Sequence, residues 1–371
     1  MTSCIFTGLL GSVLYFSADY FQDDMALWLI FSARFLQGLW TGGQQAIEQS
    51  YVSEVVEDKE KLMVLSELGI AAVSGFILGP VFGIVLSILD VQIGPLVKID
   101  KYTSPGYLQT ILTIVMFSII QSSFREVHPH NRPGRVNETK NEETTPPSKT
   151  GIGVCLFLCL IIFNGFAVQE TITTPLVTDT AHKYSETFDW EVTASYAIFA
   201  GSGVLSIIAF GVIHFIGDKV DERKLALVGL GMGALGWICL IDYQYRQINL
   251  GLFFFGYVFI SVNFPIARNV VFTMASKIIG PNRAGGYMGW MLAVGAISRM
   301  LGPFWAVQSL SISLKLCFGS TGGLFLVSMA ALAIYWKQCA PHQETQKSSI
   351  QIHMSSPVSS SSIGYKSNKL N

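Results

Sequence analysis

Five ionisable side chains inside long apolar stretches of the chain are candidates for a site, because a charge is costly there. Three are arginines, Arg34, Arg268 and Arg299, and two are glutamates, Glu67 and Glu170. A charge at the centre of a bilayer costs about 2.5–3.5 kcal/mol on insertion scales, so such residues usually face a cavity or a partner. A guanidinium stays protonated and binds carboxylates, phosphates or halides, whereas a carboxylate takes up and releases protons. The set therefore indicates a slightly positive cavity for a small anion, with a titratable coupling group.

Polar residues near these charges extend the expected site. Spacings of three and four residues place Gln37 and Thr41 on the same helix face as Arg34. The alternative for Arg34 is a structural ion pair that only holds two helices together, and for Glu67 it is solvation at the membrane surface. The expected substrate-binding residues are Arg34, Gln37, Thr41, Asn164, Asn263, Arg268 and Arg299, and the expected coupling residues are Glu67 and Glu170.

Patterns that mark other kinds of chemistry are missing from the sequence. It contains no G-x-x-x-x-G-K-[ST] loop for ATP phosphates, no G-x-S-x-G and no H-E-x-x-H. The six cysteines show no metal-ligand spacing, and a formal net charge of −1 offers no basic excess for nucleic acid. We therefore expect no enzymatic activity, no cofactor, no metal and no nucleic-acid partner.

The elements that must position these residues are membrane-spanning helices. Half of the 371 residues are hydrophobic and only 13% are charged, against about 25% charged in soluble domains. A helix needs about 20 apolar residues to cross the hydrocarbon core. Windows of that length predict ten spans, at residues 3–18, 25–48, 63–89, 105–124, 151–176, 192–216, 225–241, 250–273, 285–308 and 315–336. The predicted fold class is an all-α polytopic membrane protein in the lipid bilayer.

Two polar stretches divide the chain. Residues 125–150 separate four spans from six, and residues 341–371 are Ser-rich and too polar to fold. The expected domains are an N-terminal helical bundle at 1–124, a cytosolic linker at 125–150, a C-terminal six-helix bundle at 151–340 and a disordered cytosolic tail. Sixteen of the 24 Lys and Arg lie on the side of the linker and tail, and basic loops face the cytosol. Both termini are thus expected in the cytosol, with the tail open to cytosolic partners.

Small residues at helical spacing mark two of the predicted spans. Gly69, Ala72, Gly75, Gly79 and Gly83 form one stripe, and Gly285, Gly289, Ala293 and Ala296 form the other. Each of these spans also contains Leu-Gly-Pro, at residues 78–80 and 301–303. Such stripes let helix backbones approach closely. The repeated pattern indicates two related halves, a common build for transporters.

Three motifs, in their order along the chain, resemble signatures of the major facilitator superfamily. Residues 34–42 resemble its fourth-helix R-x-x-x-G-x-x-x-G, residues 75–83 its fifth-helix G-x-x-x-G-P-x-x-G-G, and residues 218–224 its charged loop between helices eight and nine. The last two depart from the usual pattern at Ile84 and at Asp221-Glu222. The motif positions expected to serve packing and gating are Gly38, Gly75, Gly79, Pro80, Gly83, Asp218, Arg223, Gly302 and Pro303.

The resemblance implies the major facilitator fold and a secondary transporter or channel that moves a small solute by alternating access. Aligning the motifs makes the first span equivalent to helix three of twelve, so helices one and two are expected to be missing from an incomplete N-terminus. Residues 25–125 are most similar to the lysosomal ceroid-lipofuscinosis (major facilitator domain-containing) branch, which implies an endolysosomal membrane and an anionic cargo such as chloride. The alternative is a non-transporting membrane interaction protein, or a truncated isoform without a complete cavity.

Overall fold

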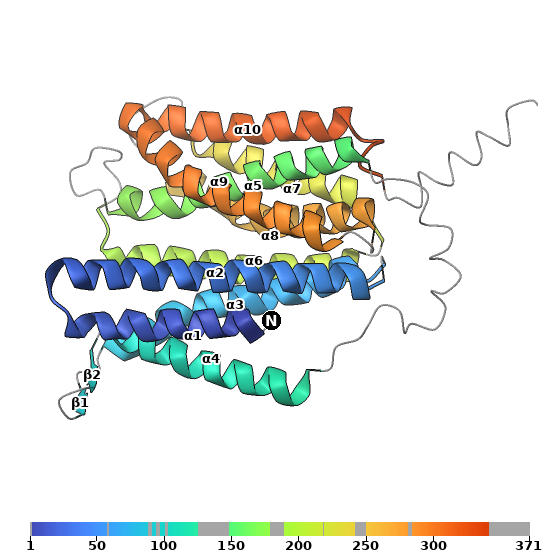
Figure 1. Ribbon diagram of the computed structural model, residues 1–371. Coiled ribbons are helices and arrows are strands. Elements are labelled where there is room, and N and C mark those ends of the chain that lie inside the picture. Colours follow the sequence, from blue (N-terminus) through green and yellow to red (C-terminus); the bar gives the residue numbers. More distant parts are fainter. Residues whose placement is uncertain are drawn as a thin grey trace, which may run out of the picture.

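Ten long helices and one small hairpin make up the described part of the computed structural model (Figure 1). The structure describes residues 2–57, 59–87, 91–93, 97–100, 103–124, 148–178, 189–217, 219–241, 250–280 and 284–340. The helices are α1 (Thr2–Ser17), α2 (Asp23–Val55), α3 (Lys61–Ser87), α4 (Ser104–Ser123), α5 (Lys149–Val177), α6 (Val192–Ile216), α7 (Glu222–Cys239), α8 (Leu250–Ile279), α9 (Ala284–Ile312) and α10 (Leu314–Ile334). A 3-10 turn, η1 (Ala18–Tyr20), joins α1 to α2.

These helices coincide with the ten predicted spans, which confirms the polytopic helical fold. Within the described residues, seven of them are long and apolar enough to cross a membrane, namely α3, α4, α5, α6, α8, α9 and α10. The other three differ for physical reasons. Helix α1 has 16 residues, α2 carries the polar stripe that starts at Arg34, and α7 begins with the charged run Glu222-Arg223-Lys224.

A hairpin adds a small β element to the expected all-α fold. Strand β1 (Val91–Ile93) pairs antiparallel with β2 (Val97–Ile99), with Gln92 opposite Lys98. Apolar and polar residue types alternate along both strands, with the two-residue period of a strand. The hairpin precedes α4 at one end of the helix bundle (Figure 1).

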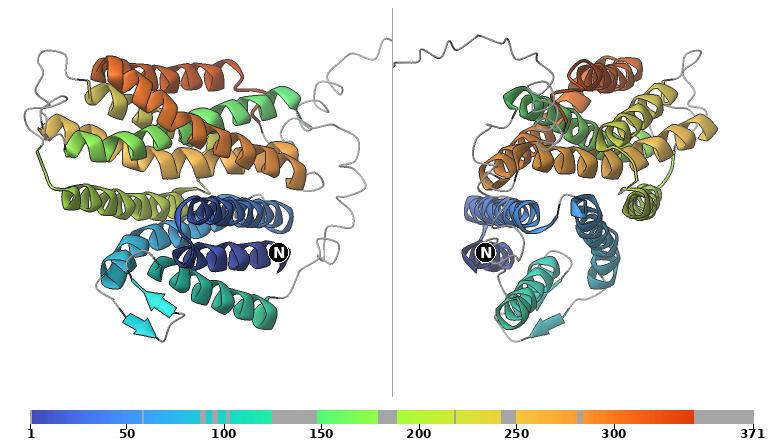
Figure 2. Two further views of the ribbon diagram at one scale, coloured as in Figure 1. Left: turned by 60° about the vertical axis from the view of Figure 1, so that its left-hand side comes forward. Right: turned by 90° about the vertical axis from the view of Figure 1, so that its right-hand side faces the viewer.

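The helices form two groups that lie side by side, α1–α4 and α5–α10 (Figures 1 and 2). We call them the N-terminal group and the C-terminal group. Successive helices run in alternating directions. The end of α4 and the start of α5 therefore lie at the same end of the bundle, which we call the linker end. The opposite end, which carries β1 and β2, is the hairpin end. The expected linker at 125–150 lies outside the described residues up to 147, as does the expected tail at 341–371.

Helix α5 is the centre of the C-terminal group. In its apolar window 67% of the residues are buried, against 11% in α4. Large side chains pack around it without exposure, including Trp237 of α7 and Phe318 and Phe325 of α10. Gly165 of α5 allows this packing, because an added Cβ atom would lie 2.6 Å from the Phe325 ring. The buried core therefore sits among α5, α7, α8 and α10, whereas α4 presents apolar side chains outward.

The predicted small-residue stripe on α9 is not the face that packs against α5. Ala293 and Ala296 are exposed, whereas Gly295 and Gly302 are buried against α5. The true contact face has the same helical spacing but is rotated around the helix axis. Spacing alone does not rank two such faces, because both consist of small residues one turn apart.

The stripe on α3 also serves close packing at only part of its length. Gly69 lies against Phe210 of α6, where an added Cβ atom would be 2.6 Å from the ring. By contrast, an added Cβ atom at Gly75 or Gly79 would meet no described atom within 4 Å. Helices α3 and α6 thus form a seam between the two groups, and the Gly-Pro motif of α3 does not supply its closest contacts.

Candidate functional site

An ion pair between α5 and α9 lies within two membrane-spanning helices. The Arg299 guanidinium donates to the Glu170 carboxylate at 3.1 Å, and their side chains are 48% and 28% exposed. A paired charge costs far less inside a membrane than an isolated one. Since both side chains are partly exposed, neither partner is enclosed by the described helices. The structure therefore brings together a predicted binding residue and a predicted coupling residue.

Aromatic rings surround this pair and the second predicted arginine of the C-terminal group. The Arg299 guanidinium carbon lies 5.4 Å from the centroid of the Phe166 ring. That of Arg268 lies 6.0 Å from the Phe163 ring and 5.4 Å from the Phe272 ring. We define the arginine–phenylalanine cluster as Phe163, Phe166, Glu170, Phe264, Arg268, Phe272 and Arg299. Arginine stacks on aromatic faces and keeps its edge free for hydrogen bonds, so the cluster can hold an anion.

A second polar network lies on α2. The exposed Arg34 donates to Gln37 at 3.2 Å and its guanidinium carbon lies 4.6 Å from the Tyr15 ring of α1. Gln37 is 8% exposed and donates in turn to Gln109 of α4 at 3.0 Å. The hydroxyl of Thr41 donates to the Gln37 carbonyl at 2.8 Å. The Thr41 hydroxyl is therefore used within its own helix, and Arg34 is the exposed charged group of this network.

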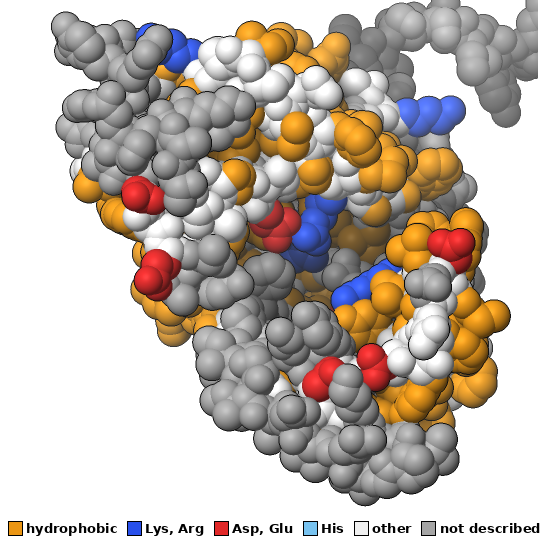
Figure 3. All heavy atoms as spheres, turned by 90° about the vertical axis from the view of Figure 1, so that its left-hand side faces the viewer, with side chains coloured by type: hydrophobic (Ala, Val, Ile, Leu, Met, Phe, Trp, Pro, Cys, Tyr) orange, Lys and Arg blue, Asp and Glu red, His pale blue; other side chains and the backbone are white. Residues whose placement is uncertain are grey.

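A hollow separates the two groups at the hairpin end. Viewed from that end, Lys or Arg and Asp or Glu side chains reach its wall among hydrophobic ones (Figure 3). At the linker end the groups touch instead. Asn269 of α8 donates to the Ser66 hydroxyl of α3 at 3.5 Å, and an added Cβ atom on Gly285 of α9 would lie 3.9 Å from Glu54 Oε1 of α2. The described helices are thus closed at one end and open at the other.

The side-chain oxygens of two predicted amide ligands are buried among the helices. Asn263 is 2% exposed and packs against α7, where an added Cβ atom on Gly233 would be 2.9 Å from its Cγ. Asn164 lies on α5 next to Gly302, and its side-chain oxygen is buried. Neither amide oxygen accepts a hydrogen bond from a described residue. Asn263 is therefore placed in helix packing rather than in the arginine–phenylalanine cluster.

Sequence reasoning missed a polar row inside the C-terminal group. Gln169 donates to Ser261 at 3.4 Å, and the hydroxyls of Thr173 and Tyr257 lie 3.4 Å apart. Gln169 and Thr173 lie one turn apart on α5. Tyr257 and Ser261 lie one turn apart on α8. Matched four-residue spacings of polar residues in two apolar helices are the signal that identifies such a row. Gln169 immediately precedes Glu170 on α5, so the row begins next to the ion pair.

The other predicted coupling carboxylate lies at the linker end. Glu67 of α3 is 56% exposed, and one of its oxygens is 3.7 Å from Nδ1 of His214 on α6. This carboxylate joins the two groups along the α3–α6 seam, outside the arginine–phenylalanine cluster.

The expected motif positions Pro80 and Gly83 lie on α3. An added Cβ atom at the motif position Gly38 of α2 would meet no described atom within 4 Å.

The charged loop before α7 is held by an ion pair between Asp221 and Arg223. Arg223 donates twice to the carboxylate of Asp221, at 3.0 Å from Nε and 2.6 Å from Nη2. Its guanidinium also lies 5.2 Å from the Trp336 ring beyond α10. Burial disfavours the charged carboxylate, but the hydrogen bonds from Arg223 outweigh it and lower the pKa of Asp221. Asp218, the first residue expected in this motif, lies outside the described residues.

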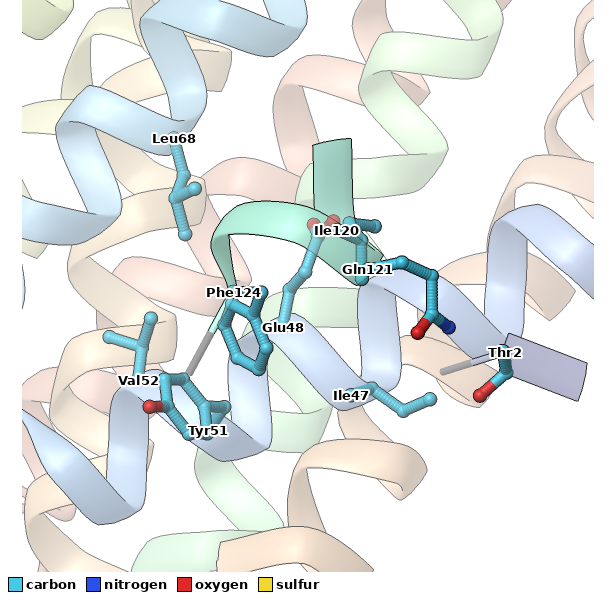
Figure 4. Close-up of a pocket in the computed structure, with 9 residues that line it drawn as sticks. All are labelled: Thr2, Ile47, Glu48, Tyr51, Val52, Leu68, Ile120, Gln121 and Phe124. Carbon is cyan, nitrogen blue, oxygen red and sulfur yellow. The ribbon is translucent and has the colours of Figure 1, made fainter. Parts of the chain in front are cut away.

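A cavity of about 500 Å³ lies within the N-terminal group near the linker end (Figure 4). Residues of α1, α2, α3 and α4 line it together with Phe124, which follows α4, and most of them are apolar; Glu48 is the charged member. None of its lining residues belongs to the arginine–phenylalanine cluster. Within the described residues, no group of three His, Cys, Asp or Glu side chains is placed to hold a metal ion.

Comparisons with known proteins agree with this architecture. A profile of the Major Facilitator Superfamily matches residues 1–303 and 165–355. Major facilitator superfamily domain-containing protein 8 of Xenopus laevis is 25% identical over 361 residues, which cover 81% of this chain and 70% of the relative.

Two solved transporter structures have the same fold. The human organic anion transporter MFSD10 superposes with a TM-score of 0.61 at 15% identity, over 89% of this chain and 75% of the other. The fucose:proton symporter FucP of E. coli superposes with a TM-score of 0.65 at 11% identity, over 90% and 82%. At these identities the likeness concerns the fold.

Proposed function

This integral membrane protein belongs to the Major Facilitator Superfamily and is a transporter of the secondary kind, and we propose that it moves a small anionic solute together with a proton. The family match bears out the resemblance of its motifs. The observation that carries the proposal is the Arg299–Glu170 pair, which places a permanent cation and a titratable carboxylate 3.1 Å apart, with both side chains partly exposed.

Competition between Glu170 and the solute couples the two ions. While Glu170 is ionised, it occupies the guanidinium of Arg299. Protonation of Glu170 removes that negative charge and leaves Arg299 free to bind an anion. The pair plus bound ions then carries the same net charge as before. Proton and anion are therefore expected to bind together and to cross the membrane together.

Alternating access needs a closed end and an open end that exchange roles. In this structure the contacts of Asn269 with Ser66 and of Gly285 with α2 close the linker end. Arg34 of α2 and Arg299 of α9 belong to opposite groups. In the proposal, rocking residues 1–124 against 151–340 moves the anion between these two arginines and opens the linker end.

The proposed setting is an endolysosomal membrane with the linker end in the cytosol. Lysines are abundant at the linker end, where the described ones include Lys59, Lys149 and Lys219, whereas the hairpin end carries Lys98 and Lys315. Basic loops are retained in the cytosol. The hollow then faces an acidic lumen, where protonation of Glu170 is favoured, and the anion leaves the lumen with the proton.

Flux through proteoliposomes of the purified full chain tests the proposal. Radiolabelled benzoate and chloride serve as probes at a series of external pH values. Glu170→Gln should keep anion uptake but remove its rise with acidity, and Arg299→Ala should lose saturable uptake. Glu191→Gln, an exposed carboxylate before α6, is the matched control. Wild-type behaviour of both cluster variants would overturn the proposal, and loss of pH dependence in Glu67→Gln alone would move the coupling role to Glu67.

A further inference from the structure

The arginine–phenylalanine cluster combines positive charge with aromatic surface. The half-buried rings of Phe166 and Phe264 stack with their centroids 4.0 Å apart and an interplanar angle of 19°. The guanidinium of Arg299 lies 5.4 Å from the Phe166 centroid. Charge and ring are thus in direct contact, so that one ligand can reach both.

A halide gains little from such a surface. The face of a phenylalanine ring is negative, so it repels an anion placed over it. A small ion also needs hydrogen-bond donors to replace its hydration. Once Arg299 is released from Glu170 its guanidinium supplies such donors from one side only, and Arg268 already donates to Asn269 at 3.4 Å. Most of the remaining wall consists of phenylalanine rings.

A carboxylate with a flat apolar body uses both parts of the surface. Its two oxygens match the fork of a guanidinium, and its flat body makes edge-to-face contacts with the rings and leaves water. Building on the proposed function, we propose that the cargo is an organic monocarboxylate with a planar, apolar body, and that chloride is a poor substrate. Phe166 and Phe264 are then the residues that set this specificity.

The experiment compares four probes in proteoliposomes of the full chain: benzoate, cyclohexanecarboxylate, acetate and chloride. Wild-type protein should take up benzoate with the lowest KM, cyclohexanecarboxylate next, and acetate and chloride weakly. Phe166→Leu keeps apolar volume but removes the ring, and should raise the KM for benzoate about three- to tenfold while leaving acetate unchanged. Phe304→Leu on α9, whose ring is 69% exposed, is the control and should match wild type.

The outcomes separate this inference from the proposed function. Equal KM values for benzoate and acetate in wild type, or chloride uptake that benzoate does not inhibit, would overturn the aromatic cargo while Arg299-dependent anion transport stands. If Phe166→Leu is not recovered folded, the wild-type series and the same measurement on Phe264→Leu decide the question. If no probe shows uptake that depends on Arg299, the proposed function fails as well.

Discussion

Gly302 of α9 lies so close to Ala167 of α5 that an added Cβ atom would sit 2.5 Å from the alanine Cβ and 3.3 Å from the Asn164 carbonyl oxygen. Two membrane helices reach this separation only where small residues meet. The contact lies one turn from Arg299 on α9 and from Glu170 on α5. It therefore sets the distance across which the ion pair forms.

Gly302→Ala should destabilise the protein, although alanine is the better helix former. Neither backbone can move away without opening the α5–α9 contact, and overpacking of this kind costs about 1–3 kcal/mol. Gly289→Ala on the same helix is the matched control, because its Cβ atom would meet no described atom within 4 Å. Thermal unfolding in detergent should show a lower Tm for Gly302→Ala and no lowering of the Tm for Gly289→Ala. Equal Tm values would mean that the helices separate freely at Gly302.

Arg34→Ala should weaken anion binding from the side of the N-terminal group. A hydrogen bond to a charged group contributes about 1.5–3 kcal/mol, so the KM for benzoate should rise about tenfold or more. Arg34→Lys keeps the charge but loses the planar fork and should fall between wild type and alanine. Unchanged KM values in both variants would assign Arg34 to structure, through its contacts with Gln37 and Tyr15.

Stability should depend on pH through Asp221. Its carboxylate caps α7 by accepting from the Arg223 backbone at 2.9 Å. The pKa of Asp221 is lower in the folded protein than in the unfolded chain. The ionised group therefore stabilises the fold above the ordinary aspartate pKa of about 3.9, and this contribution disappears as pH falls through the lower folded-state value.

Two variants separate the parts of this contribution. Asp221→Asn keeps a capping side chain but loses the charge, and Asp221→Ala loses the cap as well, at a cost of about 1 kcal/mol. At pH 7 the Tm should fall in the order wild type, asparagine, alanine. The gap between wild type and asparagine should close toward acidic pH, and a gap that widens there would contradict the assigned direction.

The two ends of the bundle should label from opposite sides of the membrane. Lys219 is exposed at the linker end and Asp189 at the hairpin end. In a parent protein with Cys4→Ser and Cys239→Ser, a single cysteine at either position is tested with a membrane-impermeant maleimide on intact endolysosomes. Lys219→Cys should react and Asp189→Cys should react only after detergent is added. The reverse pattern would invert the proposed orientation.

Hydropathy located the ten helices, because most of them are apolar over a length fixed by the bilayer. It did not identify the β1–β2 hairpin, although Val91-Gln92-Ile93 and Val97-Lys98-Ile99 alternate in the manner of strands. The two segments are only three residues long, and periodicity is weak evidence over so short a run.

The members of the candidate site could be predicted only partly from the sequence. Charges inside apolar spans identified Arg268, Arg299 and Glu170, because a membrane tolerates few of them. Phe166 and Phe264 were not distinguishable among the 25 phenylalanines of the chain, since an apolar ring faces lipid, core or cargo equally well. Asn263 was expected to bind the solute, but the rotation of α8 turns it toward α7.

Composition and spacing alone established a polytopic helical membrane protein and located the charges inside its spans, because the cost of a charge in lipid depends on residue type and position. Tertiary structure alone decided that Arg299 pairs with Glu170, 129 residues away, and that rings flank it. Such pairings depend on how each helix is rotated and which neighbours it meets. Rotation is set by packing at contacts such as Gly302 against Ala167, and these involve both helices at once.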